Sequence, residues 1–171
     1  MKILHTPEGR RRKEQGVAAV EFAIVLLPLL VIAFGAAEYG RAIYQYNTLV
    51  KSVRSAVRLL SATSPDSKTY DDTVKQAQCM AVYGNSTCDG TALAPGLTTS
   101  NVKVCDKSSF KDCPGASSTT YGSVEISGGG SLDLVEVRIS GYTFQYIGLP
   151  FVISSPSTNF GPIEAVMRQG I

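Results

Sequence analysis

A small residue and a single acid mark the start of a long apolar segment in this chain. Gly16 directly precedes the segment, and Glu21 is its fifth residue, counted from Val17. Small residues mark peptidase junctions because little side chain has to fit the protease cleft. Cleavage between Gly16 and Val17 would place a new α-amine one helical turn from the Glu21 carboxylate. A buried carboxylate is tolerated when it is paired, so we expect a processed N-terminus to neutralise Glu21, within one chain or between chains of an assembly.

Residues suited to catalysis are sparse elsewhere. His5 is the only histidine, and it lies in the segment expected to be removed. Asp71 and Asp72 are adjacent, which suits a helix start better than a carboxylate pair that acts as general acid and base. No helix is predicted after the glycine run at 128–130, unlike the pattern of a phosphate-binding loop. We therefore expect no enzyme activity, no cofactor and no metal site.

The chain has four cysteines, and all of them follow the apolar segment: Cys79, Cys88, Cys105 and Cys113. Three pairings are possible. We favour the local pairs, Cys79–Cys88 and Cys105–Cys113. In the chain-entropy account, each disulfide would close a short loop and stabilise the fold by roughly 2.5–3 kcal/mol. Zinc is the alternative, but the spacings are too wide for a zinc knuckle.

The positive charge of the chain is confined to its N-terminus. Five Lys and Arg side chains against two Glu side chains give residues 1–16 a net charge of +3, whereas the whole chain carries +2. A nucleic-acid-binding domain needs its positive charge on a folded face. We therefore expect no nucleic-acid partner and interpret the basic run as a topology signal.

Residues 17–37 predict a membrane-spanning helix. Glu21 is the only charged residue among them, and 21 residues of helix are about 31 Å long, close to the thickness of a hydrocarbon core. Five Lys and Arg residues precede the span and three follow within residues 38–57. This bias places the N-terminus in the cytoplasm and the cysteines in an oxidising compartment.

The helix is expected to continue beyond the membrane through residues 38–64 and to end before Pro65. Its apolar residues form a seam with alternating spacings of four and three: Tyr39, Ile43, Tyr46, Val50, Val53, Val57 and Leu60. Such a seam packs against partner helices or covers the sheet of its own domain, and the pattern leaves both possibilities open. Pro28 is expected to kink the helix inside the membrane.

Residues 65–171 predict a small extracytoplasmic head. A short helix is expected at 71–84, with Gly84 as its stop. Alternating patterns predict strands at 101–105, 121–127 and 132–146, with a bulge or edge shift in the last, and a final strand in the tail 159–170. The predicted fold class is α+β, with a three- to four-stranded antiparallel sheet.

The stretch RRRKEQGVAAVEFAIVLLPLLVIAFGAAEYGRAIYQ strongly resembles the TadE-like family of tight-adherence (Flp, type IVc) pilus proteins, which are pseudopilins or minor pilins. The shared features are the basic leader, Gly16 at the junction, Glu21 as the fifth residue after it and the aromatic Phe22 directly following. The resemblance covers about residues 10–60.

The resemblance implies cleavage between Gly16 and Val17 by a membrane-embedded prepilin peptidase, leaving residues 1–16 as a removed leader. It further implies a structural role in the assembly of an adhesive fibre, with Glu21 and Phe22 in the N-terminal region that contacts other pilins and pseudopilins. The implied location is the bacterial inner membrane, with incorporation into a cell-surface pilus as a further step.

Three alternatives compete with this interpretation. The N-terminus could be an uncleaved anchor, or a secretory signal cut at the small residues 35–37, although Glu21 weakens a signal sequence. The function could also be that of a membrane-anchored extracytoplasmic binding module that enters no fibre. The aromatic residues of 141–151 would then be its contact surface.

Overall fold

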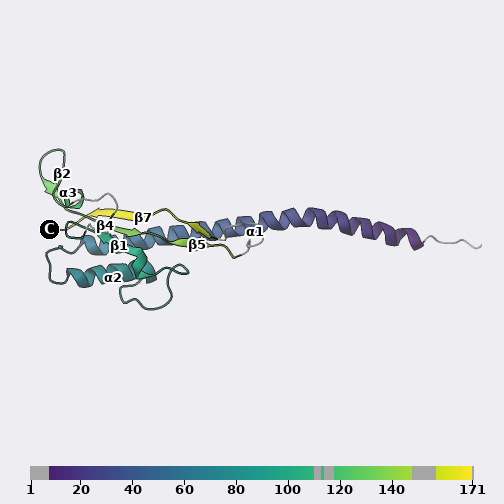
Figure 1. Cartoon of the computed structure of the whole chain (residues 1–171), viewed down its shortest axis with the longest axis horizontal. Helices are drawn as coiled ribbons and strands as arrows, with labels where there is room; N and C mark the ends of the chain where they lie inside the picture. The colour runs from purple at the N-terminus through teal and green to yellow at the C-terminus, as the bar shows by residue number, and fades with distance from the viewer. Residues whose placement is uncertain (1–7, 110–112, 114–117, 148–156, 171) are drawn as a thin grey trace, which may run out of the picture.

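The chain places a head of helices and antiparallel strands at one end of a long helix (Figure 1). The computed structural model describes residues 8–109, 113, 118–147 and 157–170. The predicted α+β class is confirmed: a long apolar helix, a second short helix and a three-stranded antiparallel sheet with two smaller strand pairs.

Helix α1 runs without a break from Glu8 to Ser61, through Pro28. It begins earlier than the predicted start near Val17. Residues 8–15 are mostly Glu, Arg, Lys and Gln, which are good helix formers and extend a helix without an apolar face. The helix ends at Ser61, before Pro65, as predicted from the proline.

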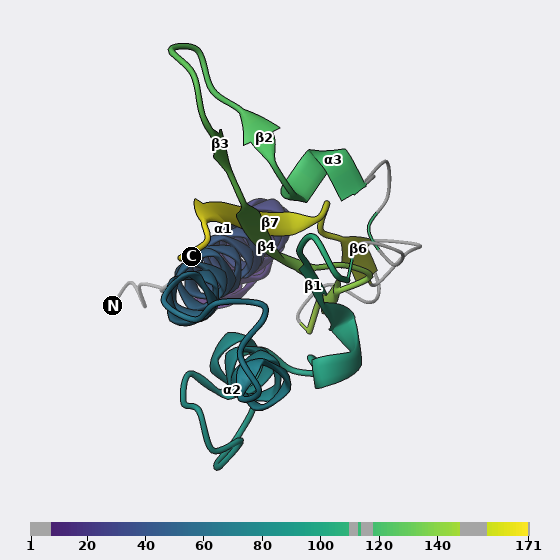
Figure 2. The ribbon, with the colours of Figure 1, turned by 90° about the vertical axis from the view of Figure 1, so that its left-hand side faces the viewer.

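Helix α2 (Tyr70–Tyr83) packs beside the outer half of α1 (Figure 2). Asp71 and Asp72 lie in its first turn, and Gly84 ends it in a left-handed conformation with φ of 77°. Both features match the prediction. The Ser52 hydroxyl of α1 lies 2.9 Å from the backbone carbonyl of Ala81, so the two helices are joined by a polar contact as well as by packing.

The main sheet has the strand order β1 (Val102–Cys105), β4 (Leu134–Ile139), β7 (Ile163–Arg168), and both pairings are antiparallel. The remaining elements are short: η1 (Thr99–Asn101), α3 (Ser118–Tyr121), and the strand pairs β2 (Val124–Glu125) with β3 (Ser131–Leu132) and β5 (Thr143–Gln145) with β6 (Ser157–Asn159). Figure 2 shows the β2–β3 hairpin projecting away from the main sheet.

The predicted strand at 132–146 is three separate strands. Asp133 separates β3 from β4, and Gly141 turns the chain between β4 and β5 with φ of 69°. Of the expected bulge or edge shift, the bulge is wrong, because β4 pairs with β7 in an unbroken register from Leu134 to Ile139. The pairing partner instead changes at Asp133, since Leu132 before it pairs with β2. The apparent slip in alternation arises because β4 is covered on both faces.

One face of β4 belongs to the main core and the other to a smaller cluster. Val135, Val137 and Ile139 are at most 1% exposed and pack with α1 and α2 in the main core. On the opposite face, Leu134 packs against Cys105, Cys113 and Tyr121. Strand β4 is therefore covered on both sides, although its second face also carries the ion pair of Glu136 and Arg138.

The predicted seam on α1 divides between two environments. Val53, Val57 and Leu60 are fully buried against the head, so this length covers the protein's own core. Tyr39 and Ile43, nearer the apolar segment, are 69% and 43% exposed. The outer length of the seam thus stabilises the head, while the inner length is left without a partner in the described chain.

The structure contains the two local disulfides, Cys79–Cys88 and Cys105–Cys113. The first ties the loop after α2 back to that helix. The second joins the end of β1 to the loop that follows it, beside the small cluster around Leu134. Both therefore fasten loops to elements that pack on α1 or β4.

Truncation of Leu60 should destabilise the head. The side chain is fully buried, so Leu60→Ala is expected to lower the free energy of unfolding by about 2–5 kcal/mol. Urea unfolding of the full chain in detergent, followed by near-ultraviolet circular dichroism, measures the change. The matched control is Arg58→Ala, an exposed position in the same turn, which should change the free energy by no more than about 0.5 kcal/mol.

Titration of Tyr121 should be displaced to high pH. Burial and the hydrogen bond that its hydroxyl donates to Glu136 raise the pKa of Tyr121 to about 12, from 10.0. The resulting stabilisation is complete below about pH 10 and is lost as the pH rises through about 12. The difference between the tyrosinate absorbance titrations of the parent and Tyr121→Phe should show a transition near pH 12; a transition near 10 would contradict the assignment.

Candidate functional site

The head does not cover the apolar segment of α1, residues 17–37, which is called the inner or apolar half of the helix below. Large apolar side chains on all sides of this segment, from Val17 to Phe34, are exposed, with accessible fractions of 38–72%. Within the described residues, α1 is the helix that is long and apolar enough to cross a membrane, and its apolar window is 0% buried. Figure 1 shows this half extending alone beyond the head. A single helix of this kind is consistent with a single-pass membrane protein.

The residues of the predicted junction lie on this uncovered half. Gly16 and Val17 are consecutive residues of α1, and a Cβ at Gly16 would meet no atom within 4 Å. Glu21 is exposed, one turn after Val17, and the neighbouring Phe22 is 65% exposed. The helix therefore presents Val17 and Glu21 on one face, with space around the bond between Gly16 and Val17.

A group of contacts joins the head to α1 directly after the apolar segment. The Arg41 guanidinium lies 2.7 Å from the Glu38 carboxylate, donates to the backbone carbonyl of Gln145 and sits over the Phe144 ring at 4.4 Å. The backbone N–H of Ile147 donates to Glu38 at 3.2 Å. We call these five residues the α1–β5 clasp. It holds the end of β5 against the helix at the edge of its apolar half.

A buried core lies behind the clasp. The Tyr142 hydroxyl donates to the Gln45 side chain of α1 at 3.0 Å, and both residues are buried. Phe144 is fully buried, with its ring 5.7 Å from that of Phe160. The predicted contact surface at 141–151 is therefore wrong for Tyr142 and Phe144, which are core residues; residues 148–151 lie outside the described residues.

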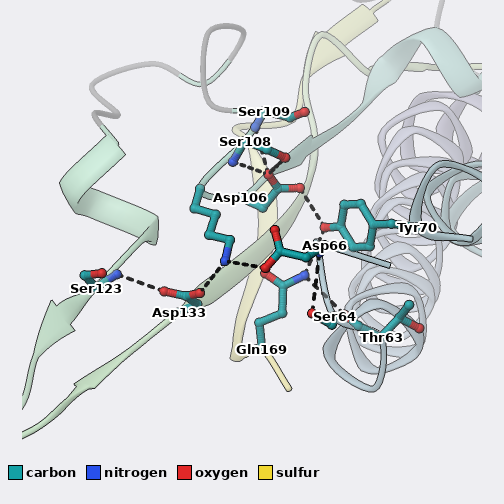
Figure 3. Close-up of polar contacts among 11 residues, drawn as sticks. Thr63, Ser64, Asp66, Tyr70, Asp106, Ser108, Ser109, Ser123, Asp133 and Gln169 are labelled. Carbon is teal, nitrogen blue, oxygen red and sulfur yellow. Dashed lines mark hydrogen bonds and ion pairs between the residues drawn. The ribbon is translucent and has the colours of Figure 1, made fainter. Parts of the chain in front are cut away.

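A second polar network closes the far end of the head (Figure 3). Asp106 is fully buried, and its carboxylate accepts hydrogen bonds from the Tyr70 hydroxyl at 2.6 Å and from the backbone N–H groups of Ser108 and Ser109 at 2.7 Å each. Burial and the bond to Asp106 raise the pKa of Tyr70. The carboxylate is saturated by protein donors, so this network positions the loop after β1.

The same network fixes the C-terminus. The Gln169 amide nitrogen donates to the Tyr70 hydroxyl at 3.1 Å and to the Thr63 carbonyl at 3.4 Å, and the Gly170 N–H donates to the Ser61 carbonyl at 2.8 Å. A Cβ at Gly170 would lie only 3.1 Å from the Ser61 oxygen, so glycine allows this approach. Gln169 and Gly170 are thus held against the end of α1 and the residues that follow it.

Lys107 supports the network from outside. Its ammonium group lies 3.2 Å from Asp66 and 3.1 Å from Asp133. Both bonds raise the pKa of Lys107, and the bond to Asp133 has the larger effect. Asp133 also accepts the backbone N–H of Ser123, which together with Lys107 lowers the pKa of that carboxyl. These charges link three loops of the head.

Sequence reasoning did not identify the clasp or the Tyr70–Asp106–Gln169 network. An acid directly after an apolar segment, with Arg three positions later, was the available signal for Glu38 and Arg41. No spacing signal connects Tyr70, Asp106 and Gln169, which are far apart in the chain. Among the described residues, no group of three or more His, Cys, Asp or Glu side chains is placed to hold a metal ion.

Removal of the Tyr70 hydroxyl should weaken the head. Tyr70→Phe leaves the buried Asp106 carboxylate and the Gln169 amide each short of one hydrogen bond, and it is expected to cost about 1–3 kcal/mol of unfolding free energy. Urea unfolding of the full chain measures the loss. Tyr83→Phe, at the other end of α2, is the control; equal effects of the two substitutions would contradict the special role of Tyr70.

Comparison with known proteins finds a family similarity in the N-terminal part of the chain. No curated protein and no solved structure is significantly similar to the chain. The model of the family described as TadE-like protein matches residues 16–58. This stretch begins at the predicted junction, contains Glu21, Phe22 and the first half of the clasp, and ends on the buried part of α1. The match supports a minor-pilin-type role associated with tight-adherence pili in general terms. The resemblance to the TadE-like family, predicted for about residues 10–60, is confirmed over residues 16–58.

Proposed function

We propose that this chain is a minor pilin, or pseudopilin, that serves as a structural component in the assembly of a tight-adherence pilus. The observation that carries the proposal is the uncovered apolar half of α1, projecting from a folded head with Glu21 as its single charge. A helix apolar on all sides needs either lipid or other apolar helices around it. Assembly into a fibre exchanges the first surrounding for the second.

Small residues on the uncovered helix support this exchange. Gly35 and Gly40 have open space where a Cβ would be, and the segment also carries Ala18, Ala19, Ala36 and Ala37. Since the head does not require these small side chains, they are available for close approach of a neighbouring helix. The proposed partners are other pilins and pseudopilins, and the proposed role is structural rather than enzymatic.

The proposed location is the bacterial inner membrane, with residues 1–16 in the cytoplasm and the head outside. The basic leader favours this orientation. The two disulfides of the head suit an oxidising compartment. A prepilin peptidase would cut between Gly16 and Val17 on the cytoplasmic side, leaving the new amine beside Glu21.

Processing is tested by the intact mass of the full chain purified from membranes of a host that carries the pilus machinery. We expect a chain that begins at Val17, and we expect Gly16→Leu to block cleavage. Gly35→Leu is the matched control, because both glycines lie in α1 and a Cβ added at either one would meet no atom within 4 Å. A wild-type chain of full length, or one that begins after Ala37, would overturn the proposed processing.

The role of Glu21 is tested separately from processing. Glu21→Ala should leave cleavage, membrane insertion and folding intact but reduce co-purification with other pilins at least tenfold, because the processed amine loses its partner. Glu125→Ala, an exposed acid on β2, is the control and should change nothing. Undiminished co-purification of the Glu21 variant would refute the pairing.

A further inference from the structure

We propose that the clasp seats the head on the bilayer, with Ile147 inserted into the lipid headgroup region and Tyr39 and Tyr44 completing an interfacial belt around α1. The inference rests on the proposed placement of the apolar half of α1 in the membrane. Its partner is a lipid surface, contacted by the head itself rather than by the spanning helix alone.

The position of Ile147 carries the argument. Its side chain is 72% exposed, although isoleucine is normally buried. Its backbone N–H donates to Glu38, the residue that directly follows the apolar segment 17–37. An apolar side chain of the head is therefore held at the level where the hydrocarbon region would end.

The charges at this border are compatible with lipid contact. Glu38 and Arg41 are paired at 2.7 Å, and Arg41 also uses the Gln145 carbonyl and the Phe144 ring. The next charged residue of α1 is Lys51, about 20 Å beyond Glu38 along the helix axis. At the end of the apolar segment the two charges are therefore paired, which makes contact with the lipid headgroup region less costly than it would be for two isolated charges.

Two exposed tyrosines occupy the other sides of the helix. Tyr39 and Tyr44 are 69% and 73% exposed. At about 100° per residue they lie roughly 100° and 120° to either side of Glu38, and within about 9 Å of it along the axis. Helical side chains incline toward the N-terminus, so both rings lean toward the membrane. Tyrosine is enriched at this depth because its ring is apolar and its hydroxyl reaches water.

The experiment uses tryptophan fluorescence, because the chain contains no tryptophan. The full-length variants I147W, Q145W and I126W are reconstituted into phosphatidylcholine–phosphatidylglycerol vesicles with lipids brominated near the headgroup end of the acyl chain. Gln145 is a second exposed reporter in the clasp, in case I147W does not fold. Ile126 is 47% exposed and directly follows β2, which Figure 1 places at the end of the head remote from the apolar half of α1.

We expect bromolipids to quench I147W at least twofold, with blue-shifted emission, to quench Q145W less, and to leave I126W unchanged. Clasp variants that float with the vesicles but are quenched no more than I126W would overturn the belt while leaving the membrane placement of α1 intact. Failure of the chain to float with vesicles would overturn that placement and the belt with it. The two failures are therefore distinguishable.

Discussion

Helix α1 is covered by the head along its outer part and uncovered along its apolar inner part, and the rest of the structure follows from this constraint. The outer part of α1 carries Val53, Val57 and Leu60 fully buried against the head, while the inner part leaves its apolar side chains uncovered. Because α1 is unbroken from Glu8 to Ser61, the head cannot move independently of the helix on which it is built.

The head fastens itself to this helix at both ends. At the far end, Gly170 is bound to the Ser61 carbonyl, while the saturated Asp106 carboxylate fixes the loop after β1. At the near end, the clasp joins Glu38 and Arg41 to β5. Between these points the sheet lies across α1 with β4 buried on both faces. Polar contacts thus define the ends of the interface and apolar packing fills its length.

The position of the clasp has a consequence for any assembly. The clasp lies where the apolar segment 17–37 ends, so no uncovered stretch of helix separates the apolar segment from the head. In the proposed assembly, the heads of neighbouring copies would therefore constrain how their inner helices approach one another. In the same proposed assembly, Glu21 and the small residues would govern helix contacts, whereas the shape of the head would limit which neighbours fit.

The sequence by itself determined the features that depend on local composition and spacing. The apolar run, the stop before Pro65, the acidic start and Gly84 end of α2, and the α+β class were all readable, because helix formation and capping are decided within a few residues. Only the tertiary structure decided which length of the α1 seam is buried, that residues 132–146 form three strands, and that Tyr70, Asp106 and Gln169 meet. These outcomes depend on sheet register and on contacts between distant segments. Apolar periodicity shows that a face is buried, but not what covers it.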